Sequence, residues 1–156
     1  MKVSGSYSLP VGPERAYRLL QDPGELARAM PGCESLEQIG PDEYRLRLKV
    51  ILATLTGSFE GSVRIADPTP PLSFRLMVEG SGRIGFLKGQ GVLHLAAAHP
   101  STEVEGTEVS YDGEVEVGGT LAAVGQRLVD GASKMMIKRF FEKLSQNVRE
   151  SRASLP

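Results

Sequence analysis

The hydrophobic residues of this chain recur with two different periods, and each period predicts its own kind of element. Between residues 34 and 117, apolar and polar residues largely alternate, which is typical of antiparallel strands with one buried face. After residue 120, apolar residues recur at steps of three and four, which indicates an amphipathic helix over Leu121 to Val148. Such a helix is about 40 Å long. It must lie across the sheet, because no other predicted helix is long enough to cover it.

Prolines divide the first part of the chain into one strand and two short helices. The strand covers Lys2 to Leu9 and ends before a proline, which is confined to strand ends and edges. The first helix begins at Pro13, because the fixed φ of proline suits a first helical turn. The second helix covers Pro23 to Ala29, with Asp22 as its N-cap.

Glycines occupy positions of the alternating region where inward side chains are expected. In the strand from Gly57 to Ile65, Gly57 and Gly61 share the inward face with Phe59. A strand without side chains at such positions either bends sharply or lines a space that something else fills. The glycine-rich segment from Gly80 to Gly91 is expected to form a loop with a bulge. The other predicted strands are Tyr44 to Val50, Phe74 to Val78, Val92 to Ala98 and Thr107 to Val117.

Together these elements predict an α+β helix-grip fold, in which a curved antiparallel sheet of about six to seven strands wraps around the long C-terminal helix. Two short helices follow the first strand. We expect one such domain over residues 1–150 and a short polar tail over residues 151–156. A curved sheet with one helix over its mouth commonly leaves an apolar cavity, and such cavities bind hydrophobic small molecules.

The alternation in the strands and the periodicity of the helix predict which residues face that cavity. The helix methionines either line the cavity or form plain core, and periodicity does not separate these interpretations. Met30 and Phe86 lie on connections that we expect to act as a gate, the second of them in the glycine-rich loop. The predicted walls are Phe59, Gly61, Val63, Leu76, Val78, Tyr111 and Val115 from the sheet, and Leu128, Met135, Met136 and Phe140 from the helix.

Charge argues against nucleic-acid binding. The chain of 156 residues has 18 Lys plus Arg against 19 Asp plus Glu, so no general basic field exists to hold DNA or RNA. Residues 127–152 carry seven Lys and Arg against three Asp and Glu, a net +4, which leaves −5 for the rest of a chain of net charge −1. This helix face is either solvated or attracted to an anionic membrane surface or an acidic partner. Without a secretory signal or a spanning segment, we expect a cytoplasmic protein, peripheral at the inner face of the membrane at most.

No residue pattern predicts a catalytic or metal site. His94 and His99 lie five apart near a strand end and point to opposite faces, and Cys33 adds no second soft ligand. The G-x-G-x-x-G match from Gly80 to Gly85 lacks the following helix that dinucleotide binding requires. Tyr111 is the one inward polar residue. A single phenol that hydrogen-bonds to a carbonyl indicates a binding site rather than a catalytic one.

Several short motifs resemble those of a known family. The turn Pro31-Gly32-Cys33-Glu34-Ser35-Leu36-Glu37 resembles the carbon monoxide dehydrogenase G-subunit family, and so do Phe59-Glu60-Gly61, Arg127-Leu128-Val129-Asp130-Gly131 and Phe140-Phe141-Glu142. The resemblance covers nearly the whole chain. It implies the START-like (SRPBCC) helix-grip superfamily and a role beside molybdenum-containing carbon monoxide dehydrogenase or related hydroxylases. The role that it implies is to carry a respiratory quinone or to tether the enzyme to the membrane.

We therefore expect a non-enzymatic carrier of one hydrophobic small molecule, such as menaquinone, ubiquinone or a lipid, with no built-in cofactor or metal. Two alternatives stay open. One is an enzyme of the polyketide cyclase or hydratase type built in the same cavity, which a carboxylate facing the cavity with a raised pKa would favour. The other is a ligand-free adaptor that docks on the dehydrogenase, which a filled core would favour.

Overall fold

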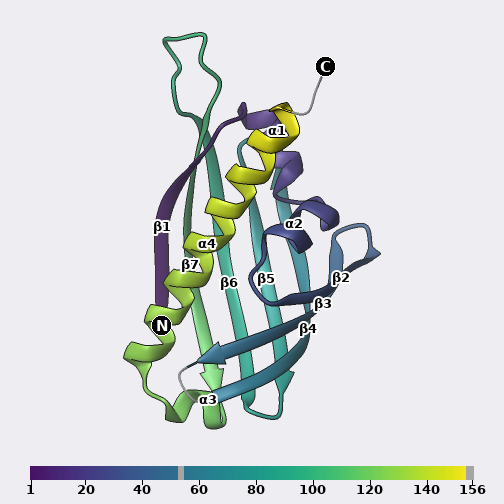
Figure 1. The fold of residues 1–156 in the computed structure, drawn as a ribbon, viewed down its shortest axis with the longest axis vertical. Coiled ribbons are helices and arrows are strands. Elements are labelled where there is room, and N and C mark those ends of the chain that lie inside the picture. The colour runs from purple at the N-terminus through teal and green to yellow at the C-terminus, as the bar shows by residue number, and fades with distance from the viewer. Residues whose placement is uncertain (53–54, 154–156) are drawn as a thin grey trace.

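A curved antiparallel sheet and one long helix make up most of the molecule (Figure 1). The computed structural model describes residues 1–52 and 55–153. The strands are β1 (Lys2–Leu9), β2 (Cys33–Gly40), β3 (Glu43–Leu52), β4 (Leu55–Thr69), β5 (Ser73–Gly82), β6 (Gly85–Ala97) and β7 (Thr107–Gly118). The helices are α1 (Pro13–Leu19), α2 (Pro23–Ala29), α3 (Thr120–Ala123) and α4 (Gln126–Ala153).

The predicted helix-grip fold is confirmed. The seven strands follow the order β1-β7-β6-β5-β4-β3-β2, so β2 to β7 form a meander and β1 joins the far edge beside β7. Two short helices follow β1, and each begins at its predicted proline, Pro13 or Pro23. α4 runs diagonally across one face of the sheet (Figure 1).

The prediction of a loop over Gly80 to Gly91 is wrong. β5 continues into this segment and β6 begins within it at Gly85, and the two strands pair without a shift in register. The curvature of the sheet explains the glycines. Gly91 of β6 is paired with Gly113 of β7, and a Cβ on Gly91 would lie only 2.9 Å from the backbone oxygen of Asp112. Glycine here permits a close approach of two strands.

The C-terminal helical region is interrupted, which corrects the prediction of one helix from Leu121 to Val148. α3 and α4 are separated at Gly125, whose φ of +103° is a conformation that other residues rarely adopt. α4 then continues to Ala153, so the expected polar tail is helical at its start, and residues 154–156 lie outside those described. No helix in the described part of the chain is both long and apolar enough to cross a membrane.

Two clusters of buried hydrophobic side chains lie at opposite ends of the space between the sheet and α4. The small cluster joins α3 and the first turn of α4 to one end of the sheet, and consists of Leu52, Phe59, Leu121 and Val129. The main cluster joins α1, α2 and the C-terminal half of α4 to the other end. It consists of Leu9, Val11, Ala16, Tyr17, Leu20, Ala29, Tyr44, Ile65, Phe74, Leu95, Val109, Phe141, Leu144 and Val148.

Candidate ligand-binding site

The inward face of the sheet is poor in side chains between the two clusters. A row of paired inward positions crosses from β4 to β7 and consists of Val63, Val78, Gly89 and Val115. In the next row, Gly91 is paired with Gly113, so three neighbouring inward positions on β6 and β7 are glycines. The three valines are only half-buried, although they face the side of the sheet that α4 covers. Val63 packs against the main cluster, and Val78 and Val115 also border a depression described below.

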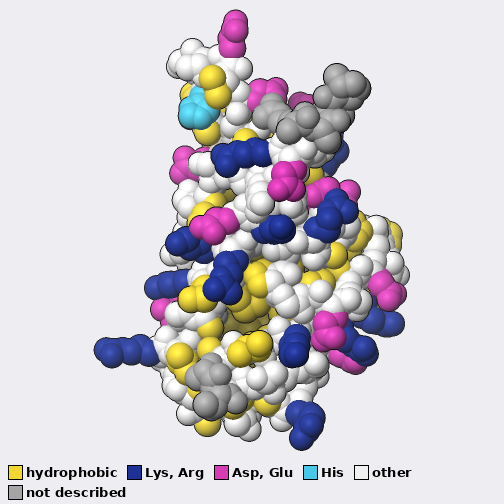
Figure 2. Space-filling view, viewed as in Figure 1, with side chains coloured by type: hydrophobic (Ala, Val, Ile, Leu, Met, Phe, Trp, Pro, Cys, Tyr) yellow, Lys and Arg dark blue, Asp and Glu magenta, His cyan; other side chains and the backbone are white. Residues whose placement is uncertain are grey.

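The helix covers this face unevenly. α4 lies against β1 on one side and α2 on the other, and of the remaining strands it approaches β3. Its sheet-facing residues Ala132, Met136 and Phe140 are half-buried, like the valines opposite. Figure 2 shows that the surface is hollowed between α4 and the pair β3 and β4, and that hydrophobic side chains gather there. We call this apolar depression, which opens between α4 and β3, the hollow.

Most of the predicted wall residues lie on the inward side of the sheet or on the side of α4 that faces it, and Val63, Leu76, Tyr111 and Phe140 among them pack against the main cluster. Those that are both inward and half-buried are Val63, Leu76, Val78, Tyr111, Val115, Met136 and Phe140. Phe59 is inward but buried in the small cluster. Gly61 also faces inward, but a Cβ there would overlap the backbone oxygen of Glu79. This glycine therefore marks a close approach of β4 and β5 and leaves no room for a ligand.

Leu128 and Met135 are not walls, which corrects the prediction. Their exposed fractions are 41% and 52%, because they lie to one side of the stripe through which α4 packs on the sheet. That stripe passes through the buried Val129 and the half-buried Met136 instead. Each of the two exposed residues directly precedes a packed residue in the sequence. A spacing of three and four residues therefore does not separate the exposed residues from the packed ones.

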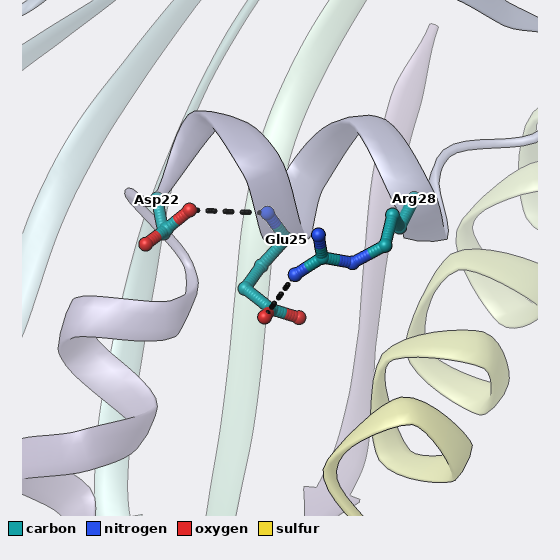
Figure 3. Close-up of polar contacts among 3 residues, drawn as sticks. All are labelled: Asp22, Glu25 and Arg28. Atoms are coloured by element: carbon teal, nitrogen blue, oxygen red, sulfur yellow. Dashed lines mark hydrogen bonds and ion pairs between the residues drawn. The ribbon is translucent and has the colours of Figure 1, made fainter. Parts of the chain in front are cut away.

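Met30 lies where it was predicted, on the connection after α2. Figure 3 shows how this short helix is fixed: Asp22 accepts a hydrogen bond from the backbone N–H of Glu25 at 3.1 Å, and the Glu25 carboxylate forms an ion pair with Arg28. Met30 is half-buried and helps to line a pocket of about 380 Å3 between α2 and α4, opposite Arg139.

Phe86 does not lie on a mobile connection. It belongs to β6, where it is paired with Ser81 of β5 and Gly118 of β7. The inward positions of β6 are its odd-numbered residues. Phe86 therefore points to the outward face, where its exposed fraction is 43%. The ring lies over Gly118. Its position on the outward face, away from the hollow, corrects the prediction that Phe86 is a gate.

Sequence reasoning missed the residues that create the hollow. Gly89 and Gly91 fell in the segment assigned to a loop, and the half-buried Leu93 and Ala132 were not proposed. The signal that could have identified them is a continued alternation along β6. Leu87, Gly89, Gly91 and Leu93 occupy the inward positions, and Lys88, Gln90 and Val92 occupy the outward ones.

Most hydroxyl groups near the main cluster are already bonded. Backbone oxygens accept from Tyr17 (Ser73, 3.1 Å), Tyr44 (Gln21, 2.7 Å) and Thr107 (Val11, 2.7 Å). Tyr111, by contrast, makes no hydrogen bond within the described residues. Its ring stacks near those of Tyr7 and Phe141, with centroids 6.3 and 6.4 Å away, and its hydroxyl lies over Gly5. Burial, and then the nearby Tyr7, raises the pKa of Tyr111, so the phenol is a hydrogen-bond donor at neutral pH.

The hollow contains little that could perform acid–base chemistry. No charged residue occupies an inward position in the strand pairs between the two clusters of the described chain. His94 and His99 are exposed, and burial raises the pKa of the half-buried Cys33 thiol. Within residues 1–52 and 55–153, no group of three or more His, Cys, Asp or Glu is placed to hold a metal ion.

A second depression lies on the outward face of the sheet and is chemically different. Its volume is about 630 Å3, and most of its lining residues occupy outward positions, among them Arg64, Glu79, Lys88, Glu114 and Glu116. The rest of its lining consists of Met1 and three members of the inward row, Val78, Gly89 and Val115. Lys88 and Glu79 form an ion pair across it at 3.6 Å. Charged side chains line this depression on its outward side, whereas the hollow is apolar, so we take the hollow as the candidate site for an apolar ligand.

Solved structures with the same fold extend over nearly the whole chain. A conserved protein from Geobacillus kaustophilus is 34% identical, with a TM-score of 0.88 and 97% of each chain covered. A START superfamily protein from Mycobacterium smegmatis is 14% identical, with a TM-score of 0.70 over 96% of this chain and 97% of that one. An aromatase/cyclase from Streptomyces sp. R1128 is 12% identical, with a TM-score of 0.67 over 96% and 93%. The last two show the START-like fold alone.

Comparison with sequence families identifies the chain more closely. A search of the curated proteins found no match. The family model described as the G subunit of carbon monoxide dehydrogenase (CoxG) matches residues 5–149, which include all seven strands except the start of β1, and most of α4. The chain therefore belongs to the CoxG family, that of the carbon monoxide dehydrogenase G subunit.

Proposed function

We propose that this protein is a carrier that holds one hydrophobic small molecule, an isoprenoid quinone or a comparable lipid, in the hollow. The observation that carries the proposal is the half-buried inward row of Val63, Val78, Gly89 and Val115, with Gly91 and Gly113 beside it. Half-buried apolar side chains on the inner side of a folded domain are stabilised when a ligand covers them.

The expected affinity suits reversible loading. Burial of roughly 300 Å2 of apolar ligand surface at about 25 cal/mol per Å2 contributes about 7 to 8 kcal/mol before the costs of association. The dissociation constant is then in the micromolar range at best. A carrier that must release its cargo needs no tighter binding.

The family supports an accessory role beside a molybdenum hydroxylase of the carbon monoxide dehydrogenase type. In this role the carrier would exchange its cargo with the enzyme or the membrane and perform no chemistry itself. The Tyr111 phenol, as a protonated donor, suits a carbonyl oxygen of the ligand. Cations on α4, such as Arg139 and Lys143 beside the pocket that Met30 lines, would favour brief contact with an anionic membrane surface.

Native mass spectrometry of the purified protein, followed by organic extraction, tests the proposal. A quinone or lipid in near-stoichiometric amount would support the carrier function and would identify the cargo. An empty protein that also fails to take up added menaquinone or ubiquinone would overturn it. The chain would then be better explained as an adaptor that docks on the dehydrogenase without a ligand.

A catalytic function in the same space has less support. The aromatase/cyclase from Streptomyces sp. R1128 shares the fold at 12% identity, which carries no activity across to this chain. Acid–base catalysis needs at least one group that changes its protonation near neutral pH, and the inward positions between the clusters of the described chain hold no charged residue. Recovery of an unchanged ligand after prolonged incubation with the protein would separate carriage from turnover.

A further inference from the structure

Positive charge gathers in the pocket between α2 and α4, two helices that lie side by side (Figure 1). This pocket is separate from the hollow, because no residue of the sheet lines it. Its charged lining residues are Arg28 from α2 and Arg139, Glu142 and Lys143 from α4. Three cations and one carboxylate give the lining a net charge of +2.

Two of the three cations have no anionic partner. Arg28 forms an ion pair with Glu25 of its own helix. Arg139 and Lys143, by contrast, form no ion pair with any residue in the described part of the chain. Residues four apart are neighbours on a helix surface, and like charges at this spacing repel each other. An anion bound between them would remove this repulsion.

The carboxylate at the pocket leaves the positive charge in place. Glu142 forms an ion pair at 3.9 Å with Lys138, which does not line the pocket. Lys138 and Glu25 are the ion-pair partners just outside the pocket, and their charges cancel, so the net charge stays at +2. A phosphate monoester carries a charge of about −1.5 to −2 at neutral pH and has three acceptor oxygens. It therefore matches the pocket better than a singly charged carboxylate does.

The remaining part of the pocket near α2 is apolar. Ala29 is buried, and Met30 and Pro31 are half-buried beside it. The connection that contains them is held on β3, because the Lys49 backbone N–H donates to the Gly32 oxygen at 2.9 Å. An organic group attached to the phosphate would lie against this apolar part, so a phosphate ester should bind more tightly than inorganic phosphate.

We propose that this pocket binds the phosphate monoester group of an organic ligand, with Arg139 and Lys143 as its principal partners. Arg28 adds a further donor, because its guanidinium has five N–H groups and only part of them is needed for Glu25. Arginine and lysine are the side chains that bind phosphate most often, arginine through a planar pair of donors and lysine as a point charge. The ester is either a soluble metabolite or a lipid headgroup, and the inference does not depend on what the hollow holds.

The test is a nuclear magnetic resonance titration of the full chain at constant ionic strength. The probes are inorganic phosphate, phenyl phosphate and benzoate, which has the same ring with a single charge. The test variant Arg139→Gln/Lys143→Gln removes both unpaired cations. The matched control Arg127→Gln/Arg149→Gln removes the same charge from exposed positions of α4 that do not line the pocket.

We expect phenyl phosphate to shift the backbone amide signals of residues 28–31 and 139–146. The test variant should lose about tenfold in affinity for phenyl phosphate, and the control should stay within about twofold of the unaltered protein. Benzoate should bind about tenfold more weakly than phenyl phosphate. Equal affinity of the two variants for phenyl phosphate would overturn the site. Equal affinity of the unaltered protein for benzoate and phenyl phosphate would overturn the assignment to a phosphate ester.

Two further measurements complete the test. Urea unfolding verifies that both variants fold, and the test variant should be no less stable than the control, because it loses a repulsive pair. Flotation with phosphatidylcholine vesicles, with and without phosphatidic acid, identifies the source of the ester. A lipid headgroup predicts that phosphatidic acid vesicles retain the control variant better than the test variant. A soluble ester predicts equal retention of both, while phenyl phosphate still distinguishes them in solution.

Discussion

Gly61 of β4 is paired with Gly80 of β5, and the strands approach so closely that a Cβ on Gly61 would overlap the backbone oxygen of Glu79. At Gly80 the nearest atom to an added Cβ is 3.7 Å away, an ordinary contact. Gly61→Ala should therefore lower the free energy of unfolding by about 2 to 3 kcal/mol, because the sheet must shift to admit one methyl group. Gly80→Ala should change it by less than about 1 kcal/mol. Urea unfolding curves measure the free energy of unfolding of the two variants. Equal losses in the two would contradict the close approach of β4 and β5 at Gly61 as the cause.

A larger side chain inside the hollow should exclude the ligand without unfolding the protein. Val78 is half-buried in the inward row, whereas Val109 is 0% exposed in the main cluster. Val78→Trp should lose binding of an apolar probe and change the free energy of unfolding by about 1 kcal/mol at most. Val109→Trp should lose about 3 kcal/mol, because it overpacks a filled core. Equal destabilisation of the two variants would show that other side chains already fill the space beside Val78.

The Asp22 cap should stabilise α2 and so hold Met30 beside the opening. Asp22→Ala removes the acceptor of the Glu25 backbone N–H and should cost about 1 kcal/mol in the free energy of unfolding. Asp22→Asn keeps a side-chain oxygen there and should cost less than half as much. Thermal unfolding followed by circular dichroism measures both variants. An equally large loss of stability in Asp22→Asn would indicate that the charge of Asp22, and not its hydrogen bond, stabilises α2.

Alkaline pH should destabilise the folded chain through the phenols of Tyr44, which is buried, and Tyr111, which is half-buried. Burial is the main cause that raises the pKa of Tyr44 and of Tyr111, with Asp42 adding to the first and Tyr7 to the second. Both groups stay protonated in either state below about pH 9, so their contribution is constant there. Above that pH the unfolded chain ionises first, and stability falls until the folded pKa values are passed.

The ultraviolet absorbance of phenolate follows this titration directly. Part of the tyrosine signal of the folded protein should appear at higher pH than in urea, and Tyr111→Phe should remove part of that late signal. Urea unfolding of the unaltered protein should show a falling midpoint over the same pH range. A titration that is identical in the folded and unfolded states would contradict burial as the cause of the raised pKa values.

The fold could be predicted from the sequence because its signals are local. Alternation over β3, β4 and β7 and the prolines that begin α1 and α2 each depend on a few neighbouring residues, and the structure confirms them. The prediction for the segment Gly80 to Gly91 is wrong because a high glycine content is typical both of loops and of strongly curved strands. Only the pairing of Gly91 with Gly113 distinguishes these cases, and it joins positions that lie far apart in sequence.

The candidate site was predicted less completely, for a related reason. The inward residues of the sheet follow from alternation alone, so Val63, Val78 and Val115 were identified. The orientation of α4 depends on the break at Gly125 and on contacts with β1 and α2, none of which periodicity contains. Leu128 and Met135 were therefore assigned to the walls when they lie beside the opening.

The pairing of β1 with β7 has a consequence for the newly made chain (Figure 1). Strands β3 to β7 can each pair with the strand synthesised just before them, but Lys2 has no partner until Glu114 has been made. Such long-range pairing raises the contact order, which slows folding. β1 and α4 then complete the fold last, after β7 and the residues of α4 have been synthesised. A ligand of the proposed carrier would therefore be bound only after α4 has been synthesised and has packed on the sheet.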